Sequence, residues 1–427
     1  MQILIIGGGG REHALAWKAA QSPGAEKVHV APGNAGTARE TGVENVAIGA
    51  EDIEGLTRFA TENAIDLVIV GPEAPLVEGV SDRLREAGIA VFGPSQAAAQ
   101  LEGSKSFAKD FLARHSIPTG EYQTFSDPES ALEYLREKNA PIVIKADGLA
   151  AGKGVIVAET LPEAEHAVRD MLAGNTFSDA GHRVVIEECL LGEEASFIAM
   201  VDGANILPLA SSQDHKRVGD DDTGSNTGGM GAYSPAPVVT DDVHERIMRE
   251  VIEPTVKGMA EEGRPYTGFL YAGLMISPNG SPKVIEFNCR LGDPETQPLL
   301  MRLRTDLIQL CLAGARGELD QVSCDWDERT ALGVVMAAGG YPAKYRKGDA
   351  ISGLDDVDAA DRKVFHAGTQ QDESGQVVTA GGRVLCVTAL GETVADAQNS
   401  AYDGVEHIHW EDAHYRRDIG FRALERT

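Results

Sequence analysis

Apolar and polar residues alternate over the first hundred positions as short apolar runs separated by amphipathic stretches. This order is typical of a parallel α/β sheet, and we predict an N-terminal Rossmann-like domain over residues 1–102. Each strand runs into a loop rich in glycine or proline. Ligands of open α/β sheets bind at the carboxyl ends of the strands, so these loops should line one pocket. The predicted strands are 2–6, 28–31, 66–70 and 90–92, and the predicted helices are 11–21, 51–63 and 78–87.

The glycine run that follows the first strand, Gly7 to Gly10, does not fit a dinucleotide-binding motif. Glu12 and His13 stand where a third glycine would be required, and no acid follows the second strand to hold a ribose hydroxyl. The pattern therefore disfavours NAD or FAD. The amides of a glycine turn at a helix N-terminus remain suited to a phosphate.

A second glycine-rich loop, residues 148–154, follows an apolar strand at 141–145 and precedes another at 155–158. Its spacing is not that of a P-loop, and in protein kinases the glycine loop precedes the strand lysine. Lys145 ends the first strand, where its ammonium group could contact a phosphate. The alternative is a hairpin hinge with solvated lysines.

The remainder of the chain shows further helix and strand patterns. From about residue 326 the pattern changes to short strands and turns, and we place a separate C-terminal domain there. The glycine-rich loop 222–231 is expected to be mobile or to wrap a ligand rather than to join the core. Helices are expected at 104–115, from Asp127-Pro128, at 161–173, 241–262, 297–312 and 393–408. The stretch 184–194 is expected to join two strands, the second at 195–201, and further strands are expected at 206–209, 269–276, 283–289, 332–337, 363–367 and 383–387.

Two polar residues, Glu286 and Asn288, interrupt the apolar strand at 283–289. Residues i and i+2 of a strand point to the same face, so the two side chains lie together. A carboxylate beside an amide oxygen makes half of a hard ligand set for Mg²⁺. A buried ion pair between Glu286 and a lysine or arginine is the alternative.

Composition is that of a globular protein of several domains, with 427 residues, 42% hydrophobic and 24% charged. The five cysteines are scattered without C-x-x-C spacing, which suits a reducing cytoplasm and disfavours a zinc site. The apolar run Ile3–Ile6 is too short for a signal peptide, and no stretch approaches the roughly 20 apolar residues of a membrane span. We expect a soluble, cytoplasmic protein.

Charge sets a further limit on partners. Sixty-six acidic residues against 38 basic ones give a formal charge of −28. Such a surface repels nucleic acid and anionic membranes at long range. An anionic substrate would need a locally basic pocket, so clustered lysines and arginines are informative here.

Taken together, strand residue Lys145, loop 148–154, the acidic connection 187–194 and the Glu286/Asn288 pair resemble the ATP-grasp superfamily. Over essentially the whole chain, four further stretches resemble the glycinamide ribonucleotide synthetases (phosphoribosylamine–glycine ligases). The resemblance implies an ATP-grasp domain at 103–325 with a small lid subdomain at about 122–190, and a β-rich C-terminal domain at 326–427. These stretches are Gly7–Leu15, Asp214–Arg217, Asn226–Gly231 and Arg290–Glu295.

The resemblance implies a ligase of the second step of de novo purine synthesis. ATP would phosphorylate the carboxylate of glycine, and the amine of 5-phosphoribosylamine would displace phosphate from the glycyl phosphate. The products are glycinamide ribonucleotide, ADP and phosphate. The implied cofactors are ATP with Mg²⁺ or Mn²⁺, and the partners are these small molecules only, with a monomer expected and a weak homodimer as the alternative.

Family resemblance also implies residues for ATP and metal. Lys105 and Lys145 would contact the phosphates, and the loop containing Gly152, Lys153 and Gly154 would act as a lid. Glu286 and Asn288 would hold the metal, while Gly273 stands where many ATP-grasp enzymes carry a further acidic ligand. For the nucleoside, the implied residues are Glu187 at the adenine amino group, the backbone at Glu188 and Leu190 at the ring edge, and Glu194 at the ribose.

The co-substrate side is implied in the same way. Asp214 and Arg290 would hold the amine and carboxylate of glycine, and with Lys145 they are the expected catalytic residues. Lys216 is a further expected substrate contact. Gly9, Gly10, Asn34 and Glu73 would cradle phosphoribosylamine.

Three other functions remain as alternatives. The glycine run motivates a Rossmann-type oxidoreductase, and loss of catalysis would leave a nucleotide-binding protein without activity. Within the ATP-grasp superfamily, a carboxylase-type enzyme using another carboxylate is the third, although no biotin or carrier segment is present.

Overall fold

The N-terminal region forms the parallel sheet that the pattern predicts. The structure is a computed structural model and describes residues 1–149, 154–173 and 182–426. Five strands run parallel in the order β3-β2-β1-β4-β5. The short β3 was not predicted, because three residues carry no periodicity. The elements are β1 Gln2–Gly7, α1 Gly10–Ala19, β2 Lys27–Pro32, β3 Val43–Asn45, α2 Ile53–Glu62, β4 Leu67–Val70, α3 Glu73–Val77, α4 Val80–Glu86 and β5 Ala90–Phe92.

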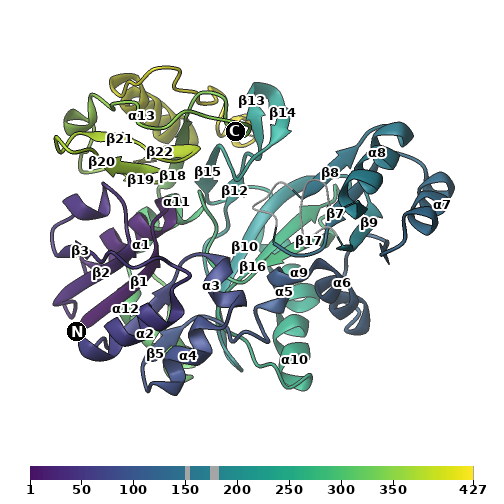
Figure 1. The fold of residues 1–427 in the computed structure, drawn as a ribbon, viewed down its shortest axis with the longest axis horizontal. Helices are drawn as coiled ribbons and strands as arrows, with labels where there is room; N and C mark the ends of the chain where they lie inside the picture. The colour runs from purple at the N-terminus through teal and green to yellow at the C-terminus, as the bar shows by residue number, and fades with distance from the viewer. Residues whose placement is uncertain (150–153, 174–181, 427) are drawn as a thin grey trace.

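A small unit that extends to one side of the molecule follows, with its own buried apolar cluster (Figure 1). Its four antiparallel strands have the order β6-β9-β7-β8. The helix expected from Asp127-Pro128 is present, and Asp127 caps it by accepting a hydrogen bond from the Ser130 N–H at 2.9 Å. The elements, with the two helices that precede the unit, are α5 Gln100–Gly103, α6 Lys105–Arg114, β6 Tyr122–Phe125, α7 Pro128–Lys138, β7 Ile142–Ala146, β8 Val155–Ala158, α8 Leu161–Leu172 and β9 Val184–Glu188.

The central sheet is antiparallel, in the order β11-β10-β16-β17, and contains the expected hairpin of β16 and β17. The helix expected at 241–262 is interrupted by a π-helical turn at Met248–Ile252, and the one expected at 297–312 is two helices. The elements are β10 Glu193–Asp202, β11 Ile206–Pro208, α9 Asp241–Ile247, α10 Glu253–Glu261, β16 Thr267–Ile276, β17 Pro282–Asn288, α11 Thr296–Arg302 and α12 Leu307–Arg316.

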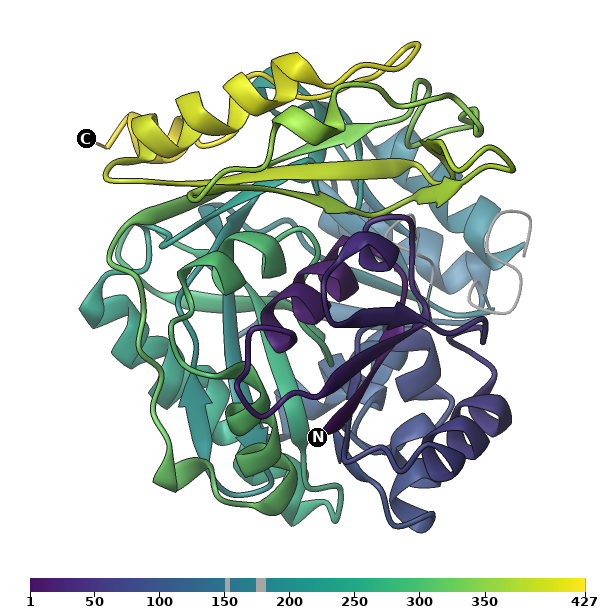
Figure 2. The same cartoon turned by 90° about the vertical axis from the view of Figure 1, so that its left-hand side faces the viewer.

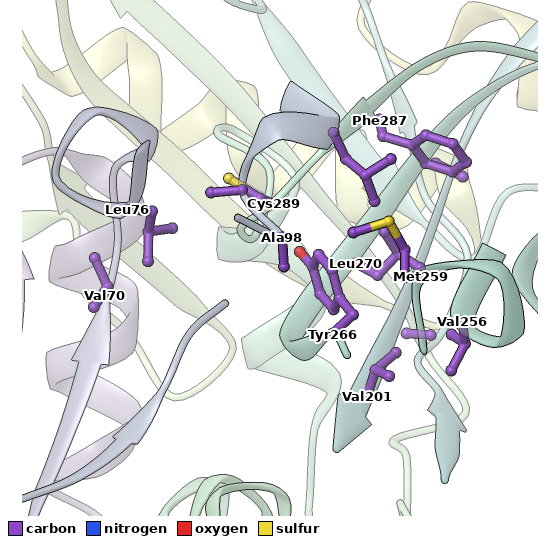
Figure 3. Close-up of a cluster of buried hydrophobic side chains, with 14 of the residues drawn as sticks. Val70, Leu76, Ala98, Val201, Val256, Met259, Tyr266, Leu270, Phe287 and Cys289 are labelled. Carbon is purple, nitrogen blue, oxygen red and sulfur yellow. The ribbon is translucent and has the colours of Figure 1, made fainter. Parts of the chain in front are cut away.

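One apolar core joins the N-terminal and central sheets. Figure 3 shows Val70 and Leu76 from β4 and α3, with Leu270 and Phe287 from β16 and β17, all part of the same buried cluster. Burial of each such side chain contributes about 1.5–3 kcal/mol relative to exposure. The two regions are therefore held together by the hydrophobic effect and not by surface contacts alone.

The C-terminal sheet takes two of its five strands from much earlier in the chain. Its order is β12-β15-β18-β22-β19, and β12 and β15 precede residue 326. Helix α13 packs over this sheet, and the N-terminal region lies beneath it (Figure 2). The elements are β12 Gln213–Asp214, β13 Arg217–Gly219, β14 Thr223–Asn226, β15 Gly231–Ser234, β18 Thr330–Ala337, β19 Arg362–His366, β20 Thr369–Gln371, β21 Val377–Thr379, β22 Arg383–Gly391, α13 Val394–His407 and α14 Phe421–Leu424.

This pairing corrects the interpretation of 222–231 as a loop outside the core. Residues 223–226 form β14, and Met230 is fully buried in the C-terminal apolar cluster. Gly231 begins β15 and pairs with Val334 of β18. The partner strand lies about a hundred residues later, so local composition could not reveal it.

Helix α1 also contacts the C-terminal sheet, through a buried histidine. The backbone N–H of His366 donates to Nδ1 of His13 at 2.7 Å, and Nε2 of His13 lies 3.0 Å from Glu40. Because Nδ1 accepts a hydrogen bond, the His13 ring is neutral and its proton is on Nε2. Within the described ranges, no helix is long and apolar enough to cross a membrane.

Candidate active site

A cavity of about 680 Å³ opens where the small β6–β9 unit, the central sheet, the N-terminal loops and the C-terminal sheet meet. Its lining includes most of the residues expected from the sequence: Glu73, Lys105, Lys145, Gly154, Glu187, Glu188, Leu190, Glu194, Asp214, Lys216, Glu286, Asn288 and Arg290. Gly152 and Lys153 lie outside the described residues.

Three expected residues are not in this lining. The side chain of Asn34 donates to the Gly8 carbonyl at 3.0 Å and to the His366 carbonyl at 2.8 Å, so it joins loops of the N-terminal and C-terminal regions. The Gly9 N–H donates to Glu12 at 2.6 Å. Gly10 begins α1 beside Gln297. These three residues lie outside the cavity lining, and their contact with phosphoribosylamine stays a prediction.

The nucleotide side of the cavity contains a buried carboxylate between two lysines. Glu187, 5% exposed, forms ion pairs with both Lys145 and Lys109. Burial alone would raise the pKa of Glu187, but the two ammonium groups hold it below its ordinary value. Lys145 also donates to the Ile285 carbonyl at 3.0 Å, which ties β7 to β17. The ammonium of Lys145 is therefore held at a fixed place in the wall.

Lys109 was not singled out from the sequence. It follows Lys105 by four residues, which places both on one face of α6. Lys105 donates to the carbonyl of Gly148, the first residue of the glycine-rich loop 148–154, at 2.8 Å. Burial lowers the pKa of both lysines. The helical spacing of these two residues was the available signal.

The metal candidates lie on one strand, β17, as predicted. Burial opposes ionisation of Glu286, yet Lys216 and Lys145 hold its pKa below the ordinary value. Asn288 accepts a hydrogen bond through Oδ1 from Arg290 at 3.1 Å. Gly273 is paired with Glu286 across the sheet, and a Cβ there would lie 3.4 Å from Glu286 Cγ.

This donor set fits a divalent cation. Carboxylate and amide oxygens are the ligands that Mg²⁺ prefers, and Mg²⁺ keeps several water or phosphate ligands beside one or two from the protein. In the part of the chain that the structure describes, no group of three His, Cys, Asp or Glu residues could hold a metal. Glu286 and Asn288 therefore stay the predicted protein ligands at this position.

The other half of the cavity is built around Arg290. Its guanidinium lies 3.3 Å from Glu73 and 3.1 Å from Glu102. Burial alone would lower the pKa of Arg290, but the two carboxylates outweigh it and hold the pKa above its ordinary value. Glu102 is fixed in turn by the Cys289 N–H at 2.7 Å. Glu102 was missed because nothing in its local sequence distinguishes it from a surface acid.

Two carboxylates, Asp214 and Glu295, also line this half. Glu295 is 3% exposed and accepts hydrogen bonds from Ser196 at 3.0 Å and Tyr271 at 2.9 Å. Burial and the neighbouring Glu295 raise the pKa of Asp214 well above its ordinary value. A cationic ligand here would relieve that repulsion, which fits an ammonium group.

A larger groove of about 1010 Å³ lies between α9 and the turn that joins β16 to β17. None of the expected site residues lines it. Its arginines are already paired, since Arg246 donates to Glu250 at 3.1 Å and Arg426 forms an ion pair with Glu193. The 680 Å³ cavity is the one that combines lysines, paired oxygen ligands and buried carboxylates.

Comparison with known proteins finds matches over nearly the whole chain. Models of the N domain, the ATP-grasp (A) domain and the C domain of phosphoribosylglycinamide synthetase match residues 1–102, 103–296 and 331–422. Phosphoribosylamine–glycine ligase of Yersinia pestis is 70% identical over 426 residues, covering 100% of both chains. That of Escherichia coli (strain K12) is 69% identical, covering 100% of this chain and 99% of the relative.

Solved structures show the same relationship. The crystal structure of phosphoribosylamine–glycine ligase from Thermotoga maritima has a TM-score of 0.86 and 36% identity, covering 98% of this chain and 100% of that one. Biotin carboxylase from Campylobacter jejuni has a TM-score of 0.76 at 16% identity, covering 99% and 95%, and is similar in fold alone.

The fold of the chain, together with its matches to the family models and to the named ligases, defines its class as an ATP-grasp ligase. The chain belongs to the phosphoribosylglycinamide synthetase family.

Proposed function

We propose that this protein is a phosphoribosylamine–glycine ligase, which joins glycine to 5-phosphoribosylamine with cleavage of ATP to ADP and phosphate. The observation that carries the proposal is one cavity with two halves. Lysines and an oxygen pair line one half, and Arg290 with buried carboxylates lines the other. The oxidoreductase alternative lacks support, because the full-length relatives are ligases.

The first step is phosphoryl transfer. A carboxylate oxygen of glycine attacks the γ-phosphorus of ATP, the bond to the β-phosphate oxygen breaks, and ADP leaves. Positioning and charge neutralisation supply most of the catalysis in such transfers. Lys105 and Lys145 bind the phosphates in this proposal. Mg²⁺ or Mn²⁺, when bound by Glu286 and Asn288, would neutralise phosphate charge.

The second step forms the amide. The amine nitrogen of phosphoribosylamine attacks the acyl carbon of glycyl phosphate, the bond to phosphate breaks, and the nitrogen loses a proton. Arg290 holds the carboxyl group of glycine, and Asp214 holds its ammonium group. Glu73, ion-paired to Arg290, brings the N-terminal region to this half of the cavity, where we place phosphoribosylamine.

Nucleoside contacts are proposed at Glu187, at the backbone of Glu188 and Leu190, and at Glu194. Glu194 forms an ion pair with Lys216 in this structure, so a ribose hydroxyl would share it. We further propose that the protein works as a cytoplasmic monomer, with domains at 1–102, 103–325 and 326–427.

The test is an assay of ADP release and of glycinamide ribonucleotide by mass spectrometry. Product should require ATP, a divalent cation, glycine and phosphoribosylamine together. Other small carboxylates in place of glycine serve as controls. ADP release that depends on neither co-substrate would refute the proposal.

A further inference from the structure

Arg383, from the C-terminal region, lines the half of the cavity around Arg290, called here the co-substrate half. It contacts two segments there, the glycine-rich residues 226–231 and the loop that contains Asp293. It begins β22, more than ninety positions after the Glu286/Asn288 strand, and it lines the cavity. The register of β22 against β18 shifts next to it, between Met336 and Ala337. Such bulges re-aim side chains. The irregularity thus lies at the residue whose side chain lines the cavity.

On one side, Arg383 holds the glycine-rich strap, residues 226–231. Its Nη1 donates to the Gly228 carbonyl at 2.6 Å and approaches that of Gly229 at 3.4 Å. The Gly228 N–H donates to the Tyr341 hydroxyl at 3.0 Å, a second C-terminal contact. A Cβ on Gly229 would lie 2.7 Å from Oδ1 of Asp214, so the strap backbone lies directly against this carboxylate.

On the other side, Arg383 holds Asp293. Its Nη2 lies 3.3 Å from the Asp293 carboxylate, and its Nη1 donates to the Asp293 carbonyl. The Asp293 carboxylate also accepts from Gln297 at 2.9 Å and lies 3.5 Å from where a Cβ of Gly9 or Gly10 would be. Asp293 thus lies between Arg383 and the N-terminal glycine turn.

We infer that Arg383 is a positioning residue for the two co-substrates, which it serves by fixing the strap beside Asp214 and the Asp293 loop beside the N-terminal glycine turn. The inference rests on the proposed function. A planar guanidinium can bond several acceptors in fixed directions, and a lysine ammonium cannot reproduce that geometry. The ATP half is anchored separately, because Lys105 and Lys145 are bound to Gly148 and Ile285.

The experiment compares Arg383→Lys, Asp293→Asn and the double variant with the unaltered protein. A charge-assisted hydrogen bond is worth about 10- to 100-fold, so Arg383→Lys should raise KM for glycine and for phosphoribosylamine by about that factor. The Kd for ATP, measured by titration calorimetry without co-substrates, should change by no more than about twofold. The double variant should be no worse than the poorer single variant.

Arg362→Lys is the matched control. Arg362, on the neighbouring strand β19, also binds carbonyls, donating to Val357 at 2.8 Å and Ser400 at 3.0 Å, but it is outside the cavity lining. Its substitution should leave every KM unchanged. If Arg383→Lys does not fold, Asp293→Asn is the test. It should raise KM for glycine and phosphoribosylamine and leave the Kd for ATP almost unchanged.

Unchanged KM values in folded variants, equal losses for ATP and co-substrates, or simple additivity in the double variant would each overturn the role of Arg383. Failure of the proposed function is a different result. In that case the unaltered protein would form no glycinamide ribonucleotide.

Discussion

At the scale of single residues, the site contains buried charged side chains, and each is tolerated because an oppositely charged side chain lies beside it. Glu187 is buried between Lys109 and Lys145. Each lysine ammonium would be costly to bury without that carboxylate. Removing Glu187 would therefore leave buried charge uncompensated, and the same ion pairs hold the ammonium group of Lys145 in the cavity wall.

Replacing Glu187 by Gln should leave the buried ammonium groups of Lys109 and Lys145 without their carboxylate partner. Breaking a buried ion pair by removing one partner costs about 3–5 kcal/mol, and chemical denaturation should show a loss of that size in the free energy of unfolding. Glu165→Gln is the control, because Glu165 pairs with Arg136 and Arg169 at the surface. Glu165→Gln should leave the free energy of unfolding almost unchanged. An equally small effect of Glu187→Gln would show that Glu187 does not compensate the buried charges of Lys109 and Lys145.

Glu286→Gln tests the metal position. The amide keeps the shape but loses the charge, so turnover should fall by about 100-fold or more and the Mg²⁺ concentration for half-maximal rate should rise. Melting temperature should stay within a few degrees because Glu286 borders the cavity and not the apolar core. Glu261→Gln on α10, whose carboxylate pairs with Lys257, is the control. Full activity of Glu286→Gln would exclude a metal role.

At the scale of elements, the strap shows how backbone geometry shapes the cavity. Gly229 has φ of +115°, and a Cβ there would lie 2.4 Å from Pro294 and 2.7 Å from Asp214. Neither neighbour can move freely, since Pro294 adjoins Asp293 and Asp214 belongs to β12. A side chain at Gly229 must therefore displace the strap.

Gly229→Ala should lower kcat/KM for glycine by about tenfold or more, measured in the complete ligase assay. Gly263→Ala is matched to it, because Gly263 has φ of +73° but nothing within 4 Å of its Cβ. That control should cost about 1 kcal/mol of stability and leave the kinetics unchanged. Equal kinetic effects of the two substitutions would show that backbone strain alone is responsible.

Elements with strong local patterns were predictable, and those created by distant pairing were not. The N-terminal sheet and the β16–β17 hairpin follow from apolar runs, and Glu286 with Asn288 follows from a period of two. Strand β15 depends on pairing across about a hundred residues, and the start of β22, which carries Arg383, pairs with β18 across 46 residues. Local composition cannot encode such a partner, and for that reason the contribution of the C-terminal region to the cavity was missed.

At the scale of the whole molecule, the interface between α1 and the C-terminal sheet should make stability depend on pH. Burial lowers the pKa of both His13 and His366. The unfolded chain therefore binds more protons below about pH 6.5, and stability falls as pH decreases through that value. Lys363 and the carboxyl of Glu40 also face His13, but the pKa of Glu40 is lowered to about 2, so it stays ionised in this range.

Between pH 7 and 5.5 the free energy of unfolding should fall by about 1–3 kcal/mol from these two histidines. Denaturant titrations at several pH values measure the slope. His13→Gln should reduce it, whereas His407→Gln, at an exposed position of α13, should not. A slope that is the same in both variants would place the pH dependence elsewhere.

The order in which the sheet strands occur along the chain has a consequence for synthesis. β12 and β15 emerge from the ribosome long before β18 and β22, the strands that complete their sheet. Until then β15 can pair with β12 but its edge toward β18 has no partner, and the strap has no Arg383 to bind. A nascent chain can fold its N-terminal sheet early, but the half of the cavity around Arg290 is complete only when translation is nearly finished. We therefore expect products of premature termination to lack ligase activity and to expose an unpaired strand edge.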